Sequence, residues 1–348
     1  MSGYVDVGTI ESFDLEEHCE ALSPTWNVEF KQLSRGPFHA RLDYLQCDNV
    51  LCYSERWGQR LQVQGTSPAG FFMFGVAATP GLIWDGTQVY HDSLPVKHSA
   101  EAVDFSGTQD HAVLLVRPSA LEACLGEEQT AALMARKHTV GCDRRASARL
   151  GQTIRRLIER CAGHLSSVDM AREGRSIEWE VLSLLEGLAE PETSQPTRRG
   201  KSNRQRAYQR ALELTSTQGF SHTIPMLARQ VGVSQRTLEL AFQEAIGMPP
   251  SKYLRWARLN GLRRDLLHAD PATATVTQLG FGWGFCELGR MAVEYRRLFG
   301  EPPSLTLFRR PTSPETLLTP RPRSAAQGPE HHEPYAYART GLTVHPVA

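Results

Sequence analysis

The side chains in this sequence that are best suited to chemistry are polar residues that follow two glycine turns near the C-terminal end. Gln235 and Arg236 come directly after Gly232-Val233-Ser234, and Arg290 follows a second glycine-rich segment at 280–284. Gln can bond adenine and Arg can bond guanine through paired hydrogen bonds in the DNA major groove. The residues that we predict to contact bases are Gln235, Arg236, Glu239, Leu240 and Arg290.

One pattern of apolar residues and glycines occurs twice in this region, 52 to 53 residues apart. Each copy has small or apolar residues at i, i+3, i+4 and i+7, a glycine, and a second stretch with apolar residues four apart. The residues before the turn are Ile224, Leu227, Ala228 and Val231 in the first copy and Val276, Leu279, Gly280 and Trp283 in the second. This pattern is typical of a helix-turn-helix, so the sequence predicts two such units.

A helix from Pro249-Pro250-Ser251 through Leu267 is predicted between the two units. Its polar residues include several Lys and Arg, Arg263 and Arg264 among them, and the second unit ends in a pair of Arg residues. Cations at such positions neutralise DNA phosphates, although they can also lie on a helix face that is only solvated. The residues that we predict to contact phosphates are Lys252, Arg255, Arg296 and Arg297.

Charge is divided unevenly along the 348 residues, although the formal net charge is zero. Residues 1–196 carry 17 Lys and Arg against 27 Asp and Glu, a net charge of −10, and residues 197–311 carry 18 against 8, a net charge of +10. A basic half that coincides with the repeated pattern is typical of a DNA-binding domain joined to another domain.

The chain is therefore predicted to be an α+β protein with two domains. Residues 38–116 contain short β-like runs between turn signals, which favour an antiparallel sandwich or barrel, and residues 119–190 have helical periodicity. We expect an irregular or partly helical lead-in at 1–35, a sensor or dimerisation domain at 1–190, a linker at 191–203, an all-α double helix-turn-helix domain at 204–310 and a disordered tail at 311–348.

Several other classes of protein are disfavoured by the sequence. No run of about 18 apolar residues occurs, the seven cysteines are scattered, and no His-x-His pair or nucleophile motif is present. We therefore expect a cytoplasmic protein with no membrane segment, no catalytic residue, no metal and no cofactor. Aromatic residues of the first domain could line an effector pocket or could simply be core, and its helices could pair two chains or pack on the basic domain.

The repeated region resembles the AraC/XylS family of bacterial regulators. The resemblance lies in Gly232–Phe242, Gly247–Arg255, Trp283–Arg290 and Tyr295–Ser304, and the second unit is similar to the branch that contains the ethanolamine-utilisation regulator. It implies a seven-helix DNA-binding domain, a cupin-like barrel in front of it, and activation of a nearby operon with RNA polymerase as partner. The alternatives are a constitutive regulator whose first domain only dimerises, and a cupin metalloenzyme fused to a DNA-binding module.

Overall fold

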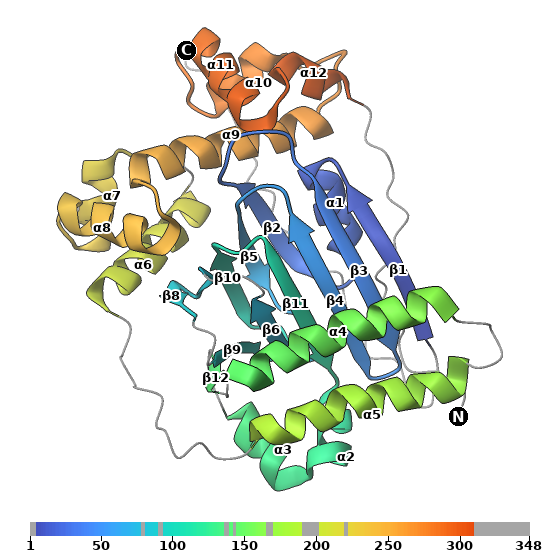
Figure 1. Cartoon of the computed structure of the whole chain (residues 1–348). Coiled ribbons are helices and arrows are strands. Elements are labelled where there is room, and N and C mark those ends of the chain that lie inside the picture. The colour runs from blue at the N-terminus through green and yellow to red at the C-terminus, as the bar shows by residue number, and fades with distance from the viewer. Residues whose placement is uncertain are drawn as a thin grey trace, which may run out of the picture.

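The computed structural model describes residues 5–77, 81–89, 93–135, 139–141, 144–164, 170–189, 202–218 and 222–309. An N-terminal domain of strands and helices packs against a C-terminal domain of helices (Figure 1). The expected linker lies almost wholly outside the described residues, and the expected disordered tail lies outside them entirely.

The N-terminal domain contains two antiparallel sheets. The larger has the order β1 (Val5–Ser12), β3 (Ala40–Cys47), β4 (Val50–Trp57), β11 (Asp110–Val116), β6 (Phe72–Ala77), β9 (Ser93–Lys97) and β12 (Thr139–Gly141). The smaller has the order β2 (Asn27–Gln32), β5 (Leu61–Thr66), β10 (Ala102–Ser106), β7 (Ile83–Trp84) and β8 (Thr87–Gln88). The two sheets share a core of buried aromatic and aliphatic residues that includes Phe30, Tyr53, Trp57 and Trp84.

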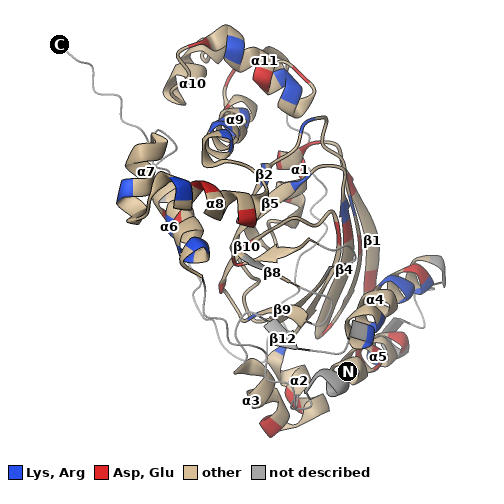
Figure 2. Cartoon of the chain, turned by 60° about the vertical axis from the view of Figure 1, so that its left-hand side comes forward, with Lys and Arg blue, Asp and Glu red and all other residues tan. Residues whose placement is uncertain are grey.

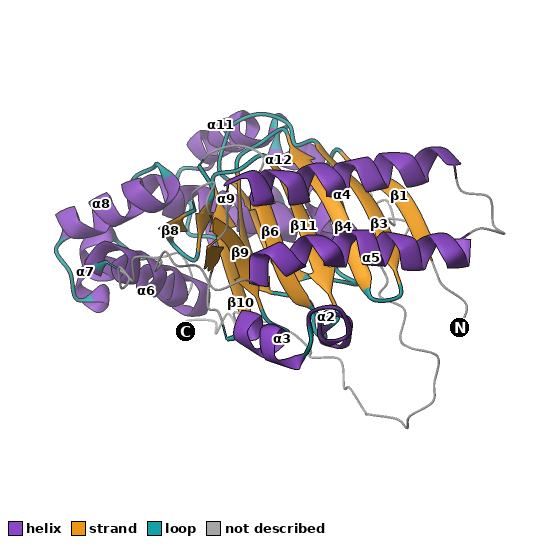
Figure 3. Ribbon diagram, turned by 60° about the horizontal axis from the view of Figure 1, so that its bottom comes forward, coloured by secondary structure: helices purple, strands orange, loops and turns teal. Residues whose placement is uncertain are grey.

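Helices cover the other face of the larger sheet (Figure 3). The helices α4 (Arg144–His164) and α5 (Met170–Ala189) bury apolar residues such as Ile154 and Val181 against strand residues such as Phe74 and Leu114. The shorter helices α2 (Pro118–Leu125) and α3 (Glu127–Met134) join the same core. The central strands are therefore buried on both faces, and every residue of β4 except Arg56 is buried.

The predicted antiparallel sheet domain with helices is confirmed, but a closed barrel is not. No strand pair among the described residues joins the two sheets, and each sheet keeps open edges. The lead-in expected at 1–35 is partly helical, as predicted, through α1 (Leu15–Leu22), but it also contains the strands β1 and β2, which were not expected. The strand β1 pairs with β3 from Val5 to Ser12, and this long-range pairing outweighs weak local signals.

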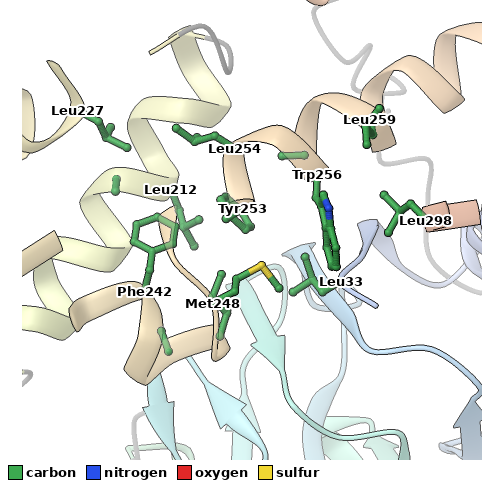
Figure 4. Packing of buried hydrophobic residues seen from close by; sticks show 14 of the residues in the cluster. Leu33, Leu212, Leu227, Phe242, Met248, Tyr253, Leu254, Trp256, Leu259 and Leu298 are labelled. Carbon is green, nitrogen blue, oxygen red and sulfur yellow. The ribbon is translucent and has the colours of Figure 1, made fainter. Parts of the chain in front are cut away.

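The C-terminal domain consists, among the described residues, of the seven helices that the resemblance implied. They are α6 (Asn203–Gln218), α7 (Ile224–Val231), α8 (Gln235–Ile246), α9 (Pro250–His268), α10 (Val276–Gly282), α11 (Leu288–Phe299) and α12 (Pro303–Phe308). One apolar cluster runs through all of them, and Leu33 of the N-terminal domain belongs to it (Figure 4). The prediction of an all-α double helix-turn-helix domain is confirmed.

The second unit is fixed to α9 through a glycine. The indole of Trp283 lies directly on Gly261, where an added Cβ would be 2.1 Å from one ring carbon. Trp283 Nε1 also donates a 2.7 Å hydrogen bond to Asp265 on the same helix. The close approach of ring to backbone therefore requires glycine at position 261.

We predict that Gly261→Ala lowers the free energy of unfolding by about 1–3 kcal/mol, because the methyl group must displace the Trp283 ring. Gly282→Ala is the matched control, since an added Cβ there meets no atom within 4 Å and alanine is favoured over glycine inside a helix. Urea unfolding of the full chain measures both variants. Equal midpoints for the two variants would contradict the prediction.

Candidate DNA-binding interface

The first helix-turn-helix is built by local caps. Thr223 caps α7 by accepting a hydrogen bond from Met226 N, and Gly232 ends this helix in the left-handed region with φ +81°. Ser234 then caps α8, as predicted, by accepting a 3.1 Å hydrogen bond from Thr237 N. A tight turn followed by a capped helix presents the start of α8 away from the core.

In the second helix-turn-helix, the start of the second helix is less well capped. Thr275 and Gln278 form a capping box at the start of α10, and Gly284 makes the turn with φ +73°. The residue that precedes α11 is Glu287, whose side chain makes no capping hydrogen bond. The start of α11 therefore lacks the side-chain cap that stabilises the start of α8.

Four of the five residues predicted to contact bases lie in the first two turns of α8. Gln235, Arg236 and Glu239 are exposed, and Leu240 is half-buried. Arg290 is exposed in the first turn of α11, but its guanidinium lies 3.9 Å from Glu287 and 3.4 Å from Glu294. Base contact by Arg290 would require it to leave these carboxylates, while base contact by the α8 residues stays a prediction.

The residues predicted to contact phosphates differ in how available they are. Arg296 and Arg297 are exposed in the last turn of α11. Lys252 is exposed, and its ammonium lies 4.4 Å from the centre of the Trp256 ring. Arg255 is half-buried and already forms an ion pair with Glu294, so it has less freedom to reach a phosphate. Basic residues lie along α9 and α11 in Figure 2.

Residues 227–309 match a family described as "Helix-turn-helix domain". Over 82 residues the chain is 45% identical to the "Probable thc operon regulatory protein" of Rhodococcus erythropolis, which is 24% of this chain and 25% of that protein. Over 105 residues it is 35% identical to "XylDLEGF operon transcriptional activator 3" of Pseudomonas putida, which is 29% of this chain and 32% of that protein. The C-terminal domain therefore contains a helix-turn-helix domain, and it is similar to the corresponding part of these two regulators.

The chain spans about a quarter to a third of the length of these relatives. A crystal structure of the "AraC-like transcriptional activator CuxR" aligns with 78% of this chain and 98% of that chain, at a TM-score of 0.40 and 14% sequence identity. Among the described residues, no helix has the length and apolar character needed to cross a bilayer. The described part of the chain also holds no group of three or more His, Cys, Asp or Glu side chains placed to bind a metal.

The C-terminal domain is held against the N-terminal domain by a buried ion network. Arg263 of α9 is 5% exposed, and its guanidinium contacts Asp14 of the N-terminal domain and lies 2.7 Å from Glu301. Arg309 bridges the same two carboxylates. Asp14 also caps α1, because its other oxygen accepts a hydrogen bond from Glu16 N. One buried network therefore joins α1, α9 and the segment that leads into α12.

This network changes the expectation for the cations of α9. Sequence reasoning placed Arg263 and Arg264 on a polar face that could meet phosphates. In the structure Arg263 is enclosed, and Arg264 lies 2.7 Å from Glu29 of β2. The signal that could have identified Arg263 was its position one turn from the apolar Leu259 and Leu266, but its partner Asp14 lies 249 residues earlier.

A groove of about 370 Å³ lies beside this network, between α1 and the end of α9. Its lining includes Glu16, Glu17 and Glu20 of α1 and His268 of α9. Burial raises the pKa of Glu16 to about 7, against the opposing charge of Arg264. Protonation of Glu16 therefore falls in the neutral range, at the contact between the two domains.

We predict that Arg263→Ala lowers the free energy of unfolding by about 3–5 kcal/mol, because two buried carboxylates lose their buried counter-charge and keep only Arg309, which is 34% exposed. Arg264→Ala is the control, since its side chain is 39% exposed and such a pair contributes at most about 1 kcal/mol. Denaturant unfolding of the full chain measures the difference. If both variants unfold at the same midpoint, the buried network is not a main source of stability.

Proposed function

We propose that this chain is a sequence-specific DNA-binding regulator of transcription that activates an operon in response to a small effector. The observation that carries the proposal is the pair of helix-turn-helix units, the first of which exposes polar residues at the start of its second helix. The two relatives described above are named as an operon regulator and an operon activator. A basic domain that carries two helix-turn-helix units can bind two successive segments of the major groove.

The first unit should supply most of the sequence reading. Arg236 is exposed in the first turn of a capped helix, whereas Arg290 is engaged with two carboxylates. The second unit would then add mainly phosphate contacts through Arg296 and Arg297. This division of roles follows from the exposure of Arg236 and from the ion pairs that Arg290 makes.

We predict that Arg236→Ala weakens binding to the preferred site by about 1–3 kcal/mol and relaxes specificity at one or two base pairs. Arg297→Ala should weaken binding to all sequences alike, because a phosphate contact carries no sequence information. Binding by both variants is measured on selected and random duplexes over a range of salt. A uniform loss for Arg236→Ala, or affinity of the wild-type chain that does not fall with salt, would count against the assignment.

A small cavity between the two sheets supports the effector part of the proposal. It has a volume of about 30 Å³ and is lined by aromatic residues that include Tyr53 and Phe105, which is room for about one or two water molecules. Trp84 and His111 line it, and Trp84 Nε1 and His111 Nδ1 are both buried without a hydrogen-bond partner in the structure. A buried unpaired donor costs free energy, so we infer a small ligand with a hydrogen-bond acceptor and an apolar body, which must widen the cavity as it enters.

The cavity wall is connected to α1 through a buried carboxylate. Glu55 lies 3.2 Å from His111 Nε2 and 2.5 Å from His18 Nε2, and His18 belongs to α1. Burial alone would raise the pKa of Glu55, but hydrogen bonds from His111 and His18 hold it well below its ordinary value. The cap of α1, Asp14, contacts Arg263 of the DNA-binding domain. A movement of His111 would therefore be transmitted through Glu55 and His18 to α1, and from α1 to the DNA-binding domain.

We predict that a small carboxylate or carbonyl compound raises the melting temperature of the full chain by binding this cavity. Trp84→Phe should reduce the shift, because it removes the indole N–H and keeps an aromatic ring. Trp179→Phe is the control, since Trp179 is 64% exposed on α5. A thermal-shift screen that finds no stabilising compound, or equal shifts in both variants, would leave the constitutive regulator as the better proposal.

The remaining parts of the proposal depend on the family likeness. RNA polymerase would be the partner in activation, and a regulator of this kind would act in the cytoplasm. The exposed Trp179 supports a homodimer formed through the helices that cover the large sheet. The likeness to the ethanolamine-utilisation regulator depends on the second unit alone, at Trp283–Arg290 and Tyr295–Ser304, and the cupin-like description depends on the two packed sheets. A cupin metalloenzyme fused to a DNA-binding module is the least supported alternative, and metal analysis of the purified chain tests it.

A further inference from the structure

The N-terminal domain contacts the C-terminal ends of both recognition helices, α8 and α11, at equivalent positions of the two repeats. Each helix ends at a glycine in the left-handed region, Gly247 with φ +65° and Gly300 with φ +83°. A Cβ added at Gly247 would lie 3.4 Å from Arg60 Nη2, and one at Gly300 would lie 3.3 Å from Pro37 N. The corresponding points of the two repeats therefore touch the same domain.

Hydrogen bonds accompany these contacts. Arg60 Nη2 donates a 2.8 Å bond to the carbonyl of Ile246, the last residue of α8. The carbonyl of Leu298 in the last turn of α11 accepts a 2.6 Å bond from Gln32 Nε2 and a 3.0 Å bond from Gly36 N. Carbonyls in the last turn of a helix have no partner within the helix, and a cation near them is favoured by the helix dipole. These donors therefore stabilise and orient the two helix ends.

The donors belong to one corner of the N-terminal domain, formed by residues 32–37 and 59–60. Leu33 N donates a 2.7 Å bond to the carbonyl of Arg60, Arg60 N donates a 2.8 Å bond to Ser34 Oγ, and Ser34 Oγ donates a 2.5 Å bond to Gln59 Oε1. Leu33 also belongs to the apolar cluster that contains Met248 and Trp256 (Figure 4). Because its two segments are bonded to each other, this corner can hold α8 and α11 at a fixed separation.

We propose that Arg60 and Gln32 are positioning residues that fix the spacing between the two DNA half-sites. The proposal rests on the proposed function, because it requires two recognition helices that bind DNA. Half-site spacing follows from the separation of the recognition helices. These residues thus determine which DNA is bound although they lie outside the DNA-binding domain.

The competing explanation is that α9 sets the spacing without help. This helix connects the two units, and its Asn260 is itself bonded to Gln32 through the backbone of residue 32. If α9 alone fixed the separation, removal of the Arg60 and Gln32 side chains would leave the spacing preference unchanged. Spacing preference is therefore the measurement that distinguishes the two explanations, whereas affinity alone does not.

The experiment selects duplexes from a randomised pool with the full-length chain and sequences them. Wild type is compared with the double variant Arg60→Ala/Gln32→Ala and with Arg160→Ala. The last is the matched control, because Arg160 forms an exposed ion pair with Glu180 on the helices that cover the large sheet. We expect wild type and the control to enrich a strong half-site motif for α8 and a weaker one for α11, at a single spacing of about one helical turn. The double variant should enrich the same motifs over a spread of several base pairs.

Duplexes with one base pair inserted between the half-sites supply a second measurement. The insertion should weaken wild-type binding by roughly tenfold and weaken binding by the double variant by only about two- to threefold. An unchanged single spacing in the double variant, or a wild-type pool with only one half-motif, would overturn the inference. A wild-type pool without any enriched DNA would instead contradict the proposed function. If the double variant does not fold, Arg60→Gln alone is tested in the same way, and its spacing decides.

Discussion

The arrangement of the two domains depends on the buried guanidinium of Arg263. A charge of this kind is costly to remove from water unless carboxylates surround it with good geometry. Here one carboxylate, Asp14, comes from the N-terminal domain and the other, Glu301, from the C-terminal domain. Because Asp14 also caps α1, the charge can be satisfied only when α1, α9 and α12 are in place together. The contacts of Arg263 with these two carboxylates thus favour one arrangement of the two domains over others.

The two helix-turn-helix units share one pattern of apolar residues and glycines but differ in their electrostatics. The first begins with a capped helix and exposed polar residues, whereas the second begins without a side-chain cap. Glu294 binds both Arg255 and Arg290, so DNA must compete with a carboxylate for these two cations. Such competition lowers the gain from each contact and makes the second unit less selective.

The N-terminal domain has one core on each face of its larger sheet. The face towards α4 and α5 is mostly aliphatic, while the face towards the smaller sheet is rich in aromatic residues and contains the His18–Glu55–His111 cluster. Buried ionisable groups weaken a core unless they are paired, and here the pairing leads from the cavity to α1. Both the core between the sheets and the His18–Glu55–His111 cluster therefore include residues of α1, the helix that meets the DNA-binding domain.

The sequence by itself determined the parts of this protein that are locally encoded. Turn glycines, the Ser234 cap and the apolar repeat act over a few residues, so they predicted both helix-turn-helix units and the exposed start of α8. Tertiary structure decided the rest. The strand β1 forms because β3 pairs with it, the sheets stay open instead of closing into a barrel, and Arg263 is enclosed by a partner 249 residues away. Such contacts join residues distant in the chain, and no local pattern of residue types specifies them.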